Sequence, residues 1–159
     1  MADTRLDLKR DTLLTTLPEL GKEWEVALQI RLTEYDTAEY RSILHMTTGG
    51  DNDKYGDRTP TLEMDPRKKL YVESAASGLN YMDDRRDPIP LDTWTEVKVS
   101  QTLTSVGKYM FRIFLAGVKV FAVENTKPEV FKDVKVYATN PWKPAQAGSI
   151  KGVTIKTRK

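Results

Sequence analysis

The last third of the chain, residues 93–155, is the feature that most constrains the fold, because short runs of alternating apolar and polar residues are separated by turn residues. In one run, the apolar residues Tyr109, Phe111 and Ile113 occupy every second position. Successive side chains of a strand point to opposite faces of a sheet, so this period predicts half-buried antiparallel strands. No segment places apolar residues at helical spacing between caps. The sequence therefore predicts an all-β protein, an antiparallel two-sheet β-sandwich of the jelly-roll type.

The first half of the chain continues the same pattern. Residues 23–32 alternate strictly and place Trp24 and Leu28 on one apolar face, so this strand is expected to line the core. We expect Trp94, at the start of another alternating strand, to lie in the core as well. The other strands expected here are two short ones before residue 21 and those at residues 42–48, 61–64 and 69–73. We expect two long loops, at residues 49–60 and 77–92, and one domain spanning residues 1–159.

Composition narrows the classes of partner. The chain has 25 Lys and Arg residues against 23 Asp and Glu residues, a formal net charge of +2, which is too balanced to favour nucleic acid. No apolar run is long enough to span a bilayer, so no membrane insertion is expected, and the polar first residues lack the apolar core of a signal peptide. The absence of cysteine excludes a disulfide framework and leaves the redox compartment open.

The order of segments resembles a known family. The strand GKEWEVALQIRL, the loop GGDNDKYGDRTP, the segment PLDTWTEVKVSQ and the ending DVKVYATNPWKPAQAGSIKGVTI follow one another as in the laminin-G-like, concanavalin-A-like jelly roll. The resemblance is greatest to the single-domain version found in extracellular proteins of invertebrate animals. It implies an extracellular domain that binds glycans or matrix proteins through loops at one edge, often with calcium. Because one fold hosts many functions, it does not identify the ligand.

The residues themselves argue against an enzyme. With one histidine, His45, and no cysteine, the sequence supports neither a nucleophile with its base nor an ordinary zinc site, and His45 is expected to be structural. Glu63 and Asp65 alternate as the carboxylates of jelly-roll glucanases do. However, Pro66 interrupts the strand, and Arg67 stands where a third acidic residue would continue the series. We therefore expect no catalysis and interpret the two carboxylates as charge on an exposed face.

The loop at residues 49–60 holds the strongest chemical pattern. Asp51, Asp53 and Asp57 could surround a hard cation, and Gly56 permits the turn that brings Asp57 back toward the others. This pattern predicts a calcium ion as cofactor. The alternative is that the aspartates cap turns, with Asp57 and Arg58 forming a local ion pair.

Aromatic and polar residues of the two long loops, together with Trp142 of the segment at residues 140–142, form the candidate ligand site. A sugar is recognised by a flat apolar ring together with groups that hydrogen bond to its hydroxyls. The candidate residues are Tyr55, Arg58, Asn80, Tyr81, Arg85 and Trp142. The hypothesis requires the two loops to meet at one end of the sandwich. Two alternatives stay open: Trp142 could cover the end of the sandwich, and basic residues near the C-terminus could protect an edge strand.

We therefore predict a non-catalytic recognition module, lectin-like and extracellular, whose partner is a glycan or a matrix protein. The alternative from another class is a structural matrix protein that self-associates into a homo-oligomer. A lectin should bind a discrete subset of glycans, whereas an assembly protein should grow in size with concentration.

Overall fold

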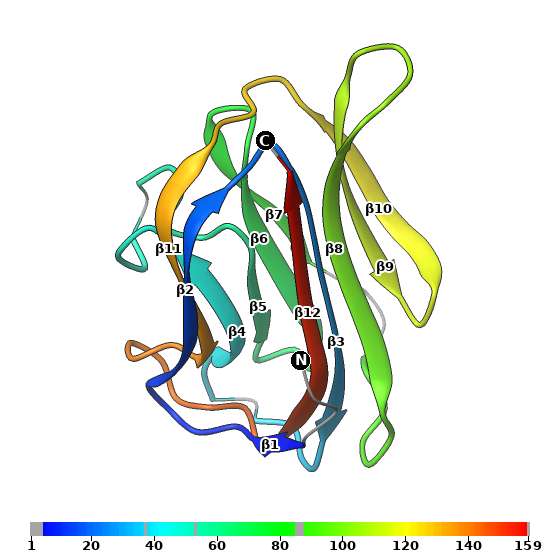
Figure 1. Cartoon of the computed structure of the whole chain (residues 1–159). Coiled ribbons are helices and arrows are strands. Elements are labelled where there is room, and N and C mark those ends of the chain that lie inside the picture. The colour runs from blue at the N-terminus through cyan, green and yellow to red at the C-terminus, as the bar shows by residue number, and fades with distance from the viewer. Residues whose placement is uncertain (1–4, 37, 53, 85–87, 159) are drawn as a thin grey trace.

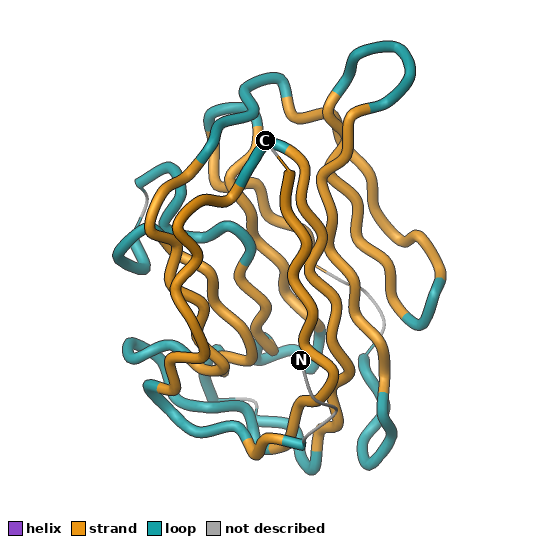
Figure 2. Tube along the Cα trace, in the orientation of Figure 1, coloured by secondary structure: helices purple, strands orange, loops and turns teal. Residues whose placement is uncertain are grey.

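Two six-stranded antiparallel sheets face each other in the structure of this protein (Figure 1), a computed structural model that describes residues 5–36, 38–52, 54–84 and 88–158. The predicted all-β sandwich is confirmed, and the described residues form strands and loops without a helix (Figure 2). The strands are β1 (Leu6–Asp7), β2 (Thr12–Leu20), β3 (Glu23–Leu32), β4 (Arg41–Thr47), β5 (Thr61–Met64), β6 (Leu70–Ala76), β7 (Leu79–Asp84), β8 (Thr95–Leu103), β9 (Tyr109–Leu115), β10 (Val118–Asn125), β11 (Phe131–Thr139) and β12 (Gly148–Arg158).

The strand order interleaves distant parts of the chain. The first sheet has the order β1-β12-β3-β8-β9-β10, and the second has the order β2-β11-β4-β5-β6-β7. Consecutive strands often lie in different sheets, and the C-terminal strands β11 and β12 pair with β2 and β3 near the start of the chain. Among the described residues no helix is long and apolar enough to cross a membrane.

The core lies between the two sheets. On β3, every second residue from Trp24 to Leu32 is at most 5% exposed, which confirms the core face predicted for this strand. The second sheet contributes Leu44, Leu62 and Val136 among others, each fully buried. Alternation along the sequence therefore sets which face of each strand packs inward.

The outer face of the second sheet is covered rather than solvated. Six of the seven residues of β4 and all four residues of β5 are buried, so both faces of these strands are shielded. The shielding comes from the loops at residues 48–60 and 140–147, because His45 hydrogen bonds to Asp57 and Asn140, and Glu63 to Lys143. This arrangement builds a polar environment outside the sandwich core.

Two predictions about the middle of the chain are wrong. Residues 79–84, expected within a long loop, form strand β7, which pairs with β6 across the turn at Ser77 and Gly78. The positive φ angles of these two turn residues allow the tight reversal. Trp94 is half-buried rather than in the core, and the Lys151 ammonium lies 4.1 Å from its ring centroid. It precedes the first residue of β8, so strand parity does not govern its direction.

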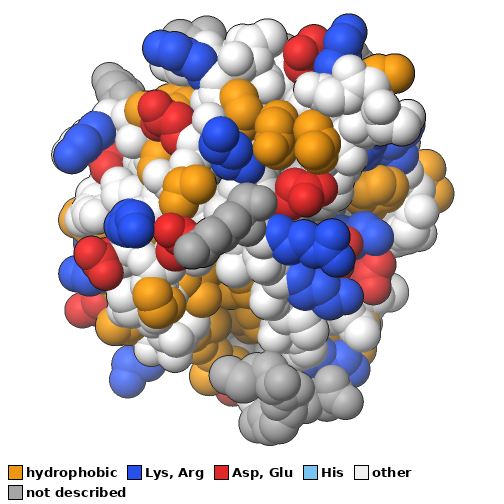
Figure 3. All heavy atoms as spheres, turned by 45° about the horizontal axis from the view of Figure 1, so that its top comes forward, with side chains coloured by type: hydrophobic (Ala, Val, Ile, Leu, Met, Phe, Trp, Pro, Cys, Tyr) orange, Lys and Arg blue, Asp and Glu red, His pale blue; other side chains and the backbone are white. Residues whose placement is uncertain are grey.

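The C-terminal strand has a partly open edge. Among the described residues, β1 pairs with β12 only at Ile150 and Ser149. Beyond these two residues, that edge of β12 has no neighbouring strand in the part of the chain that the structure describes. Exposed Lys156 and Arg158 lie on this stretch. Charged side chains on an edge strand discourage pairing with another chain, in line with the protective role offered above for the basic residues near the C-terminus. On the face drawn in Figure 3, basic and acidic side chains are interspersed, as expected from the balanced composition.

Leu28 tests the assignment of the core. Its side chain is 2% exposed between the sheets, so Leu28→Ala should leave a cavity and lower the free energy of unfolding by about 2–5 kcal/mol. Chemical denaturation measures the change. A loss below about 0.5 kcal/mol would place Leu28 outside the core.

Candidate functional site

A network of five charged side chains lies on the outer face of the second sheet. Glu63 projects from β5 and Glu73 from β6, while Asp51 and Arg58 come from the loop after β4 and Lys143 from the loop after β11. The side chains of the three carboxylates are at most 8% exposed. We call these five residues the charged cluster.

Arg58 joins its loop to the sheet. Its Nε donates to Asp51 Oδ1 at 2.7 Å, Nη1 donates to both carboxylate oxygens of Glu73 at 2.9 and 2.8 Å, and Nη2 donates to the Asp51 carbonyl at 3.0 Å. Burial works to lower the pKa of Arg58, but the hydrogen bonds to Asp51 and Glu73 outweigh it and raise the pKa. The guanidinium therefore stays charged and connects the two carboxylates.

Lys143 joins the other loop to Glu63 and to Asp51, the carboxylate that it shares with Arg58. Its Nζ lies 2.7 Å from Glu63 Oε2 and 3.3 Å from Asp51 Oδ2. Burial raises the pKa of Glu63, while the Lys143 charge and hydrogen bond oppose that rise. Asn140 Oδ1 accepts the backbone N–H groups of Trp142 and Lys143 at 2.9 and 2.8 Å, which fixes the turn that carries the lysine.

His45 is fully buried on β4 beneath the cluster. Its Nε2 lies 2.8 Å from the Asp57 carbonyl and 3.2 Å from the Gly50 carbonyl, so that nitrogen carries the proton. Its Nδ1 therefore accepts, with Thr61 Oγ1 at 2.9 Å and Asn140 Nδ2 at 3.0 Å as the donors. Burial lowers the pKa of His45, because the charged imidazolium is disfavoured away from water. A neutral ring thus organises both loops, which is a structural role.

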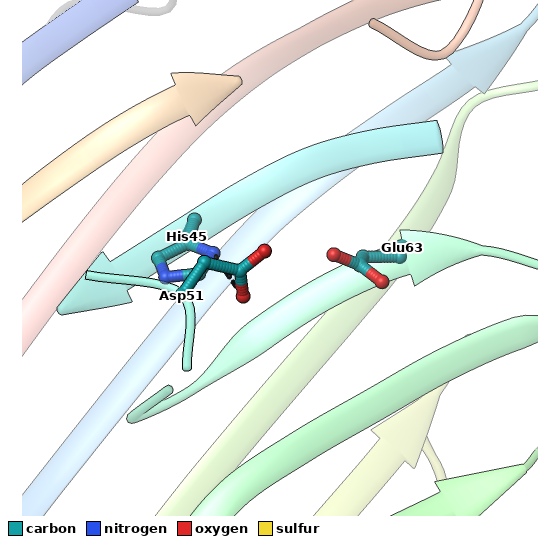
Figure 4. Close-up of side chains that lie close together, drawn as sticks. All are labelled: His45, Asp51 and Glu63. Carbon is teal, nitrogen blue, oxygen red and sulfur yellow. Dashed lines mark ion pairs between the residues drawn. The ribbon is translucent and has the colours of Figure 1, made fainter. Parts of the chain in front are cut away.

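The described residues contain one group that could ligate a metal ion. Single ligand atoms of His45, Asp51 and Glu63 lie within 4.8 Å of one another, with Asp51 placed between the other two side chains (Figure 4). His45 Nδ1 and Asp51 Oδ1 are 4.0 Å apart. The site differs from the predicted three-aspartate loop, because two of its members come from strands.

Half-exposed aromatic rings border the cluster. Tyr40 and Tyr71 meet edge to face with centroids 5.4 Å apart, and the Lys143 ammonium is 6.0 Å from the Tyr40 centroid. Trp142 is 41% exposed and packs against His45 at 5.5 Å between centroids. Burial raises the pKa of the Tyr71 hydroxyl, and the nearby Glu73 charge, to which that hydroxyl donates, raises it further. The surface therefore combines flat apolar rings with fixed charged groups.

The structure brings together two of the ligand residues expected from the sequence. Arg58 belongs to the cluster, and Trp142 borders it. Tyr55 lies elsewhere: its hydroxyl donates to the Lys127 carbonyl at 2.9 Å, and its ring packs on Phe131. For the others, Asn80 and Tyr81 lie on β7, where only the backbone is described, and Arg85 lies outside the described residues.

The three aspartates expected to bind calcium have different environments. Asp51 faces Arg58 and Lys143, whereas Asp57 Oδ2 accepts the backbone N–H of Asn52 at 3.1 Å and closes the loop. Asp53 lies outside the described residues. For Asp57, the contact is the turn cap that the sequence offered as an alternative. A calcium ion on these three residues stays a prediction.

The loop can approach the sheet because of one glycine. Gly56 has a φ of +100°, and a Cβ there would lie 2.8 Å from the ring of Phe131. Its carbonyl accepts the Thr48 N–H at 3.0 Å, which closes the base of the loop. The left-handed conformation and the contact both favour glycine.

Sequence reasoning missed Tyr40, Tyr71, Glu73 and Lys143. It also placed Glu63 and Asp65 on an exposed face, which is wrong, since both are at most 1% exposed. Asp65 accepts the backbone N–H groups of Arg67 and Lys69 at 2.9 Å, so it stabilises a turn, unlike Glu63. The sequence did indicate that Glu63 and Glu73 share a face, because polar residues alternate with apolar ones on β5 and β6. However, the same alternation is typical of a solvent-exposed face.

Comparisons with solved structures identify the fold. The chain resembles a native heptameric SAP-like pentraxin from Limulus polyphemus, with 14% sequence identity and a TM-score of 0.61, covering 98% of this chain and 71% of that chain. It resembles the CBM40 of the Ruminococcus gnavus IT-sialidase bound to alpha2,3 sialyllactose, with 11% identity and a TM-score of 0.63. The match covers 100% of this chain and 95% of that chain. A third likeness is to the carbohydrate-binding module CBM66 from Bacillus subtilis, with 11% identity and a TM-score of 0.50, covering 86% and 76%.

These likenesses show a concanavalin-A-like jelly-roll β-sandwich, the fold expected from the sequence. No protein-family model and no curated protein matches the sequence. At such low identity the fold is shared, and the site must be argued from this chain's own residues.

Arg58 should be the member of the cluster that stability depends on most. Arg58→Gln leaves Asp51 and Glu73 buried without their cation, so the free energy of unfolding should fall by about 3–5 kcal/mol. Arg112 provides a matched control, since its hydrogen bond among the described residues is to a neutral hydroxyl, that of Thr102. Arg112→Gln should cost less than about 1 kcal/mol in the same denaturant titration. Equal losses for the two variants would contradict the network.

The pH dependence of stability should report on His45, the one histidine of the chain. Because its pKa is lowered in the folded state, the unfolded chain takes up a proton first as the pH falls below about 6.5. Stability is therefore full above that pH and declines below it, by up to about 1.4 kcal/mol per pH unit. Denaturant unfolding between about pH 7.5 and 5 measures the decline. His45→Gln should show a smaller slope, and an unchanged slope would mean that the imidazole protonates in place.

Proposed function

We propose that this protein is a non-catalytic glycan-recognition module whose ligand lies on the outer face of the second sheet, over the charged cluster. The observation that carries the proposal is the cluster itself, bordered by two half-exposed rings: Tyr40, which lies near the Lys143 ammonium, and Trp142, which packs against His45.

Energetics support a functional reason for the cluster. Removing charged groups from water costs several kcal/mol for each, and a well-packed apolar replacement is often as stable. The five charged residues on this face are thus not explained by stability alone. Groups with shifted pKa values, here Glu63 and Tyr71, gather at functional sites more often than elsewhere.

The chemistry of the surface suits a sugar. Aromatic rings offer flat apolar faces to the C–H groups of a sugar ring, and charged groups bond its hydroxyls. Tyr40 and Trp142 provide the rings at 39% and 41% exposure. The networked positions of Arg58 and Lys143 mean that little side-chain entropy is lost on binding.

The resembling structures support the same class. Two of them are carbohydrate-binding modules, and one of these is bound to a sialyllactose. A hydrolase is disfavoured because Glu63 pairs with Lys143 while Asp65 caps a turn, so the two carboxylates do not act together. An extracellular location and the narrower laminin-G-like assignment belong to this proposal, whereas calcium held by Asp51, Asp53 and Asp57 is the alternative that the comparison with chelator tests.

Glycan binding should depend on the rings beside the cluster. Tyr40→Ala or Trp142→Ala removes a stacking face and should weaken binding by about 3- to 10-fold. The measurement is a glycan array of neutral and acidic sugars, run in calcium and in chelator, followed by titration of the best glycan. Tyr55→Ala is the matched control, because that ring packs on Phe131 away from the cluster.

Each outcome has a distinct meaning. Loss of binding in Tyr55→Ala alone would move the ligand to the loop edge proposed from the sequence. Binding that needs calcium and is lost in Asp57→Asn would favour the three-aspartate site. If no glycan binds, and light scattering shows a size that grows with protein concentration, the self-associating matrix protein would replace the proposal.

A further inference from the structure

We infer that Lys143 is the built-in cation of the charged cluster: its ammonium occupies the place between Asp51 and Glu63 where a metal ion would be held, so the native site needs no metal. Removing this ammonium should turn Asp51, Glu63 and His45 into a divalent-cation site. Which cation lies between Asp51 and Glu63 does not depend on the ligand that the surface binds.

The distances carry the first step. Lys143 Nζ lies 2.7 Å from Glu63 Oε2 and 3.3 Å from Asp51 Oδ2, so one positive group bridges two carboxylates. Ligand atoms of these two residues and His45 lie within 4.8 Å of one another, close to twice the bond length of about 2.0–2.6 Å that zinc and calcium make to their ligands. The ammonium and a metal ion would therefore compete for one position.

Charge balance carries the second step. Three carboxylates face two cations, Arg58 and Lys143, which leaves a net charge of −1 with His45 neutral. A divalent ion added beside Lys143 would meet an ammonium at contact distance. Without the lysine charge the cluster stands at −2, which a divalent ion neutralises.

The lysine is held in place by the residue that also holds His45. Asn140 Oδ1 accepts the Lys143 backbone N–H at 2.8 Å, and Asn140 Nδ2 donates to His45 Nδ1 at 3.0 Å. One amide thus fixes the backbone of the built-in cation and occupies the nitrogen that a metal would use. Both arrangements favour the metal-free state.

The test compares melting temperatures with and without divalent cations. Lys143→Met removes the charge and keeps most of the apolar stem. The metals are millimolar calcium and micromolar zinc, and zinc is included because His45 supplies a nitrogen ligand. In either metal the melting temperature of this variant should be at least about 4 °C higher than in chelator. The native chain should show no such rise.

Two further variants make the result specific. Lys98→Met removes a lysine that pairs with Glu25 on the other sheet, and it should show no response to metal. Adding Asp51→Asn to Lys143→Met should abolish the response. The inference is overturned if the native chain is stabilised by metal and Asp51→Asn removes that stabilisation. It is also overturned if Lys143→Met, folded by circular dichroism, does not respond.

A direct measurement covers the case in which Lys143→Met does not fold in chelator. Glu63→Gln in the native background removes one carboxylate that the ammonium bridges, and it should lower the melting temperature equally in calcium and in chelator. A loss seen only in calcium would show that metal, and not Lys143, is the cation of the native site.

Discussion

The guanidinium of Arg58 is the interaction on which the outer half of this molecule depends. It reaches from the loop after β4 to Glu73 on β6, and on the way it holds both the carboxylate and the carbonyl of Asp51. Planar, always charged and with donors in a fixed fork, it matches two acidic groups at once in a way that lysine cannot. The loop that covers the sheet is therefore fixed by charge as well as by backbone hydrogen bonds.

The molecule has two buried regions, one apolar and one polar. The space between the sheets is apolar and follows the alternation of the strands, whereas the outer face of β4, β5 and β6 is buried under loops and is polar. Buried polar groups need partners, and here His45 has hydrogen-bond partners at both ring nitrogens. A neutral histidine and paired charges make a rigid surface, on which half-exposed rings remain available to a ligand.

The likeness to pentraxin and carbohydrate-binding modules concerns the arrangement of strands, and identities of 11–14% leave the site to this chain. The cluster is specific in its chemistry, since an ammonium bridges the carboxylates that could otherwise hold a metal ion. Whether a jelly roll recognises its ligand with or without metal can thus depend on one loop residue, because the supporting strands are unchanged.

The sequence by itself determined the fold class and the core face of β3, because alternation is a local property that each strand carries alone. It also singled out Arg58 and Trp142, which the structure places in the cluster and at its border. The segment at residues 79–84 was misassigned, since its turn-forming residues conceal a strand that exists only by pairing with β6. The cluster required the tertiary structure: Lys143 meets Glu63 across 80 residues of sequence, and Asn140 meets His45 across 95. Such pairings depend on strand order and sheet packing, which no local pattern records.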